Sequence, residues 1–171
     1  MDEAIKRLET TAARLAGARL DAVRYYTLPP DPDDEWDMGV AHVLEFGLDL
    51  VTDRGTFGVT WTADEGAEYG LQIVPEPLDA SLWGEHRVLK VDDSIPWASL
   101  LGGVVERPIV RWGTAEVEAP FALDLGFEGG SHVVVAVGYW QDVGQPVYLG
   151  GDDVVVVWDQ AAVSRLLPQL D

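Results

Sequence analysis

Histidine and carboxylate side chains are the groups in this sequence that could carry chemistry, because the chain has no cysteine. His42, His86 and His132 stand apart from one another and lack the spacing of a metal site. Ser131 precedes His132, but no acidic residue is placed by spacing to complete a triad. With 30 Asp and Glu, carboxylate pairs arise by chance and do not indicate acid–base catalysis. No phosphate-binding glycine motif is present either. From these observations together we predict no catalytic residue, no metal and no cofactor.

An acidic segment with a tryptophan at its centre, PPDPDDEWDMG at residues 29–39, is the leading candidate for a binding site. Its prolines interrupt regular structure, and it lacks the Gly and Glu that a calcium loop requires at fixed positions. Tryptophan is enriched at the centres of protein interfaces, and carboxylates would pair with Lys and Arg of a basic partner. The alternative is a solvated turn without a partner. The predicted partner-binding residues are Asp31, Asp33, Asp34, Glu35, Trp36 and Asp37.

A different possibility is an enzyme or small-ligand protein with a pocket on its sheet. Polar side chains that alternate with apolar ones on the expected strands would form such a pocket if they converged. The residues predicted for this alternative pocket are His42, Glu45, Asp49, Thr60 and His132.

The elements that would position these residues follow from the periodicity of apolar side chains. Apolar residues at helical spacing predict helices at each end, and Asp159 is placed to cap the second one. Strands in succession, rather than in alternation with helices, indicate an α+β fold that is mainly antiparallel β-sheet, in a single domain over residues 1–171. The predicted helices cover residues 3–16 and 160–167, and the predicted strands cover residues 18–28, 42–51, 56–62, 69–74, 87–91, 104–112, 116–125, 133–139 and 154–158.

Two expectations about packing follow from these strands. Leu44, Phe46, Leu48 and Leu50 should face the core from one continuous strand over residues 42–51, and residues 141–153 should form a loop. Tryptophans in or beside strands should lie in the core, whereas Trp36, Trp83 and Trp97 fall in turns or loops. Of these three, Trp36 is the predicted interface anchor.

The net charge of the chain favours some classes of binding partner over others. The chain of 171 residues has 30 acidic and 11 basic residues, for a net charge of −19. Residues 2–24 hold four acids and five bases, so the remainder carries −20. This charge argues against binding nucleic acid or an anionic membrane, and it favours a basic protein partner. An acidic proteome in the source organism is the alternative explanation.

The composition and the first residues indicate the class of protein and the cellular compartment to expect. Apolar residues make up 47% of the chain, enough for a core, and the apolar runs are too short to span a bilayer. The first residues, MDEAIKRLET, do not read as a secretory signal, so we expect a cytoplasmic protein.

The order of motifs also resembles a known group. The motifs are an N-terminal helix, a strand at residues 20–26, the hairpin of residues 44–61, the segments 69–71 and 93–102, the run of residues 120–137, and DVVVVWD at residues 153–159. In this layout the chain resembles immunity-type and uncharacterised proteins of bacterial polymorphic toxin systems, especially those of actinobacteria. The resemblance implies a non-enzymatic partner that occludes a toxin domain, often a basic nuclease, and it carries over no catalytic residue.

The leading hypothesis is therefore an acidic protein-binding domain that neutralises a basic toxin. The alternatives are the enzyme or small-ligand protein described above and an accessory domain whose acidity reflects its host. The oligomeric state is left open.

Overall fold

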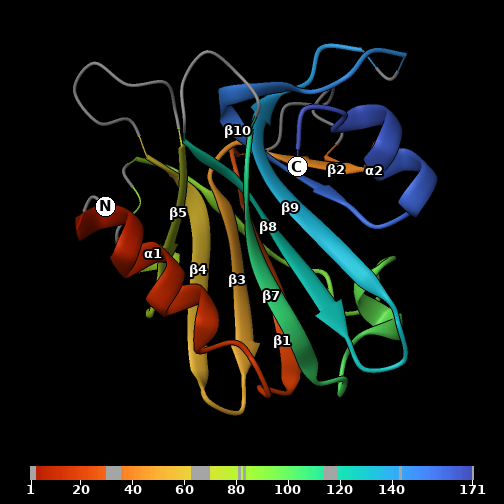
Figure 1. Ribbon diagram of the computed structural model, residues 1–171. Coiled ribbons are helices and arrows are strands. Elements are labelled where there is room, and N and C mark those ends of the chain that lie inside the picture. Colours follow the sequence, from red (N-terminus) through yellow and green to blue (C-terminus); the bar gives the residue numbers. More distant parts are fainter. Residues whose placement is uncertain are drawn as a thin grey trace.

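The chain folds into two five-stranded antiparallel sheets and two α-helices, as the computed structural model shows (Figure 1). The structure describes residues 3–29, 36–62, 70–80, 82, 84–113, 119–142 and 144–170. The elements are α1 (Glu3–Ala13), β1 (Leu20–Thr27), β2 (His42–Leu44), β3 (Gly47–Thr52), β4 (Gly55–Thr62), β5 (Gly70–Val74), the 3₁₀ turn η1 (Leu78–Ala80), β6 (Arg87–Lys90), the 3₁₀ turn η2 (Trp97–Ser99), β7 (Val105–Trp112), β8 (Pro120–Phe127), β9 (His132–Tyr139), β10 (Tyr148–Val157) and α2 (Gln160–Leu166).

The two sheets pack face to face around a shared apolar core. The first sheet has the strand order β5-β4-β3-β1-β6, and the second has β2-β10-β9-β8-β7. Because side chains alternate along a strand, every second residue points inward. Tyr25, Leu50 and Phe57 from the first sheet join Leu125 and Val135 from the second in one buried cluster.

The helices cover parts of this sandwich that would otherwise expose apolar surface. α1 contacts β5 and β7, which are edge strands of different sheets, and it buries Leu8 and Ala12 in the shared core. It therefore closes one open side between the sheets (Figure 1). α2 instead packs on the outer face of the second sheet, where Leu166 joins a second cluster with Phe121 and Val155.

Both predicted helices and the mainly antiparallel α+β class are confirmed. The side chain of Asp159 caps α2 by accepting a hydrogen bond of 2.8 Å from the amide of Ala162, as the sequence predicted. No helix among the described residues is long and apolar enough to cross a membrane.

The prediction of one continuous strand over residues 42–51 is wrong. β2 pairs with β10 in the second sheet, whereas β3 lies in the first sheet, so the chain passes between the sheets in the two intervening residues. Gly47 permits this passage, because it has a φ of +138° and a Cβ there would lie 2.2 Å from the carbonyl oxygen of Val59. Phe46 is consequently half-buried outside the shared core, unlike Leu44 and Leu48.

A further expectation is corrected. Residues 148–153 belong to β10 rather than to a loop, and the pairing of β10 with β9 shifts register between Leu149 and Val154. Gly150 has a φ of +88° within this irregular stretch, a combination that a sequence pattern reads as loop. Trp97 is fully buried in the shared core despite its position in a connecting segment.

Candidate functional site

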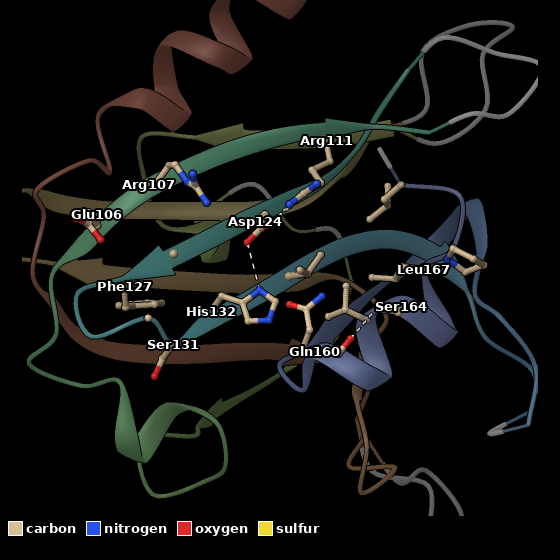
Figure 2. A pocket seen from close by; sticks show the side chains of 16 residues that line it. Glu106, Arg107, Arg111, Asp124, Phe127, Ser131, His132, Gln160, Ser164 and Leu167 are labelled. Carbon is tan, nitrogen blue, oxygen red and sulfur yellow. Dashed lines mark hydrogen bonds and ion pairs between the residues drawn. The ribbon is translucent and has the colours of Figure 1, made fainter.

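A groove of about 930 Å³ lies on the outer face of the second sheet, between β7, β8 and β9 on one side and α2 on the other. Figure 2 shows its polar side chains, with Arg107, Arg111 and Asp124 on the strands and Gln160 and Ser164 on the helix. The groove exists because α2 has seven residues and covers part of the sheet face, so β7 and β8 remain open beside it.

Strand pairing brings the polar groups of the groove together. Arg107 on β7 lies opposite Gly126 on β8, which in turn lies opposite His132 on β9. Arg111 lies four residues after Arg107 on β7, and Asp124 lies two residues before Gly126 on β8. Because side chains alternate along a strand, all four residues lie on the same, outward face of the sheet. Five residues from three neighbouring strands thus form one surface.

Asp124 organises the centre of the groove. Its Oδ2 accepts hydrogen bonds from Nε and Nη2 of Arg111, at 3.0 and 2.5 Å. Its Oδ1 lies 3.6 Å from Nδ1 of His132. Because Asp124 is only 7% exposed, the guanidinium of Arg111 supplies the hydrogen bonds that a buried carboxylate requires, and the ring of His132 lies beside it.

Two groups at the groove lack such partners. Arg107 is exposed and forms no ion pair with any residue that the structure describes. Nε2 of His132 is buried and has no hydrogen-bond partner within the described part of the chain. Gly126 lies between them in the register and has no side chain, so the floor of the groove is open at this point.

Neither serine that lines the groove is placed as a nucleophile beside His132. Ser164 donates its hydroxyl to the backbone oxygen of Gln160 at 3.1 Å, and Figure 2 shows the side chain of Ser131 pointing away from His132. No serine among the residues the structure describes is therefore hydrogen-bonded to His132, as a nucleophile paired with a base would be.

The predicted pocket residues lie in several places, and of the five only His132 lines the groove. His42 is buried beside the aromatic rings of Tyr25, Trp36 and Trp158. Its Nδ1 lies 2.7 Å from the hydroxyl oxygen of Tyr25, which also accepts a hydrogen bond of 2.5 Å from Nε1 of Trp97. Burial lowers the pKa of His42 to about 4, against a smaller opposing effect of Asp37, and burial also raises the pKa of Tyr25.

Asp49 lies on the outer face of the first sheet, where it holds the η1 turn. Its carboxylate accepts hydrogen bonds from the hydroxyl of Tyr26 at 2.6 Å and from the backbone amide of Leu78 at 3.0 Å. Burial raises the pKa of Asp49, although both hydrogen bonds oppose this shift. These contacts explain Asp49 as a structural residue.

Glu45 and Thr60 support the passage between the sheets. A carboxylate oxygen of Glu45 accepts from the amide of Leu28 at 3.2 Å, and the hydroxyl of Thr60 donates to the carbonyl of Phe46 at 2.6 Å. Both side chains thus fix the backbone around β2 and β3.

The predicted partner-binding segment is described only in part. Asp31, Asp33, Asp34 and Glu35 lie outside the described residues. Trp36 is half-buried, and its ring centroid lies 4.7 Å from that of His42 and 5.5 Å from that of Tyr25. Asp37 is exposed, with Oδ1 3.7 Å from Nε2 of His42. The tryptophan therefore packs against the protein's own core.

Sequence reasoning missed Arg107, Arg111 and Asp124 as members of a site. The available signal was the even spacing of the two arginines on a predicted strand, opposite a strand with one aspartate among apolar residues. Within the described residues, no three His, Asp or Glu side chains are grouped so that they could hold a metal ion.

Comparisons of the chain with protein-family models, with curated proteins and with solved structures find no match.

Proposed function

We propose that the protein binds a basic protein partner in the cytoplasm without catalysing a reaction on it, as an immunity-type protein that covers a toxin domain. The observation that carries this proposal is the uncompensated negative charge. The chain has a net charge of −19, and among the described residues the ion pairs to arginine are Arg19–Asp21 and Arg111–Asp124. Most carboxylates thus remain available to a partner, and a field of this sign accelerates encounter with a basic surface.

The predicted contact residues are the acids of residues 31–37, with Trp36 in a changed role. Because Trp36 packs on His42 and Tyr25, it contributes to the protein's own core. Removal of Trp36 would therefore disturb the fold as well as any interface, and loss of binding in Trp36→Ala would not identify a contact. Charge reversal of the acids is the cleaner test.

The experiment begins with affinity capture of the partner from native lysate. The captured protein is then purified, and its binding is measured at about 50 and about 200 mM salt, a range over which screening weakens exposed charge pairs. The proposal expects a basic partner, a stable complex, and an affinity that falls by about tenfold or more between these salt concentrations.

A matched pair of variants locates the contact. One variant changes Asp31, Asp33, Asp34 and Glu35 to Lys, and the control changes four exposed acids elsewhere, namely Glu3, Glu9, Asp93 and Glu128. Both variants alter net charge equally, so a loss of affinity confined to the first assigns the contact to the acidic segment. Equal effects would refute that assignment, and an acidic partner or salt-independent binding would refute the proposal as a whole.

The enzyme alternative has less support, because His42, Glu45 and Asp49 have structural partners and lie outside the groove. The accessory-domain alternative remains the interpretation to adopt if the captured partner binds through a surface without excess acidic residues.

A further inference from the structure

We propose that the groove beside α2 binds a small organic acid, with an oxyanion head at Arg107 and His132 and an apolar body along α2. The ligand class is an amphipathic molecule that bears a carboxylate or phosphate group. This site is separate from the proposed protein interface and does not depend on it.

The first argument is the local sign of the charge. The chain has 11 basic residues against 30 acidic ones, yet Arg107 and Arg111 face the same groove. Asp124 is bound to Arg111, whereas Arg107 has no ion-pair partner in the described part of the chain. Glu106 is the other acid of the groove, and no ion pair joins it to Arg107. A guanidinium without a partner is a ready binding group for an oxyanion.

The second argument is the unsatisfied nitrogen of His132. Asp124 lies on the Nδ1 side of the ring, at 3.6 Å, so Nε2 is the nitrogen left for another group. Nε2 is buried in this structure, so an oxyanion would accept a hydrogen bond from Nε2–H only after a rotation of the ring, and that bond would remove the cost of a buried nitrogen without a partner. Gly126 separates Arg107 from His132 in the register, which leaves space for the head of the ligand between them.

The third argument is that the lining of the groove changes from charged side chains at one end to apolar side chains at the other. The α2 side carries the polar Gln160 and Ser164 and, toward its C-terminal end, an apolar stretch of half-buried Val163 and Leu170, buried Leu167 and exposed Pro168. Figure 2 shows Leu167 at the opposite end from Arg107. The volume of about 930 Å³ far exceeds that of one phosphate and is within the range of small-molecule sites. An apolar body attached to the anionic head would use this additional space.

Titration of isotope-labelled protein at constant ionic strength, followed by backbone amide NMR shifts, tests the proposal. The probes are octanoate and octyl phosphate, each compared with its head alone, acetate or inorganic phosphate, and with uncharged octanol. We expect shifts at residues 124–134 and 160–170, and at least about tenfold tighter binding of the long probes than of the heads alone. The ratio of octanoate to octyl phosphate affinity identifies which head the site prefers.

Two variants make the outcome decisive. Arg107→Gln should weaken the long anionic probes by about tenfold or more, whereas Arg165→Gln, which makes the same charge change on α2 outside the groove lining, should alter affinity by less than about twofold. Gly126→Val fills the floor without a charge change and should also abolish binding. The proposal is overturned if the groove amides do not shift, if octanol binds as tightly as octanoate, or if the two arginine variants have equal effects.

Discussion

The hydroxyl oxygen of Tyr25 lies 2.7 Å from Nδ1 of His42, and this contact joins the two sheets in the interior of the protein. Tyr25 belongs to β1 of the first sheet, whereas His42 begins β2 of the second. His42 is 1% exposed, so the neutral ring is strongly favoured. A buried, neutral histidine makes the stability of the fold depend on pH.

Replacement of His42 by Gln should therefore reduce the loss of stability in acid. Burial lowers the pKa of His42 from 6.5 to about 4. Between these values the unfolded chain binds a proton that the folded protein does not, so the free energy of unfolding falls as pH decreases. We expect wild type to lose up to about 3 kcal/mol more than His42→Gln over this window, measured by urea unfolding.

Tyr25→Phe provides the control for this experiment. It removes the hydroxyl and leaves Trp97 Nε1 without its acceptor, which should cost about 1–3 kcal/mol at every pH. It retains the burial of His42, so its free energy of unfolding should still fall as pH decreases, as in wild type. If His42→Gln lost as much stability in acid as wild type, the pH dependence would not arise from His42.

The carboxyl group of Asp153 should make the free energy of unfolding depend on pH with the opposite sign. Burial raises its pKa from 3.8 to about 7, with further contributions from the carboxylates of Asp152 and Glu45. Between these values the folded protein holds a proton that the unfolded chain has lost, so the free energy of unfolding decreases as pH rises. Asp153→Asn should therefore be more stable than wild type at pH 8, and this advantage should shrink toward pH 4.

The matched variant is Asp93→Asn, at an exposed carboxylate with the same change in net charge. Urea unfolding across the pH range should show a smaller stabilisation that does not follow the same pH window. If both variants gave the same curve, the effect would arise from net charge alone.

Local patterns in the sequence predicted the parts of the fold that depend on local chemistry. Alternation found the hairpin of β3 and β4, and Asp159 marked the start of α2. The crossing at Gly47 was missed because a period of two continues through it in the sequence, while the close approach of the Val59 carbonyl, which only a glycine at position 47 allows, is a non-local contact. The burial of Trp97 was not predicted, because it packs in a core cluster with residues far away in the chain, among them Tyr25.

The candidate site depends almost wholly on information of this non-local kind. His132 was selected from the sequence, but its neighbours Arg107, Gly126 and Asp124 follow from the register of β7, β8 and β9. Register is set by turn geometry and core packing together, and a single sequence does not specify both. The extent of the groove further depends on how much of the sheet α2 covers.

The ion pair of Arg111 and Asp124 should show strong energetic coupling. Arg111→Gln leaves the carboxylate of Asp124 largely buried without its main partner and should destabilise the protein by about 2 kcal/mol. Asp124→Asn should cost less, about 1 kcal/mol, because Arg111 is one-third exposed and can be hydrated. The double variant should be more stable than the sum of the two effects predicts, by about 1–2 kcal/mol in urea unfolding. Additivity within about 0.5 kcal/mol would mean that the pair is not coupled.

Gly47→Ala should be among the most damaging single substitutions in the chain, although it adds one methyl group. The φ of +138° is unfavourable for alanine, and the added Cβ would lie 2.2 Å from the backbone oxygen of Val59, which cannot move without breaking the pairing of β3 with β4. We expect a loss of about 3 kcal/mol or more in the free energy of unfolding. Gly126→Ala is the comparison, because its Cβ would meet its nearest neighbour, the carbonyl oxygen of Arg107, at an ordinary 3.5 Å. That variant should stay within about 1 kcal/mol of wild type in the same urea titration. Similar losses for the two variants would show that Gly47 is not required where the chain passes from the second sheet to the first.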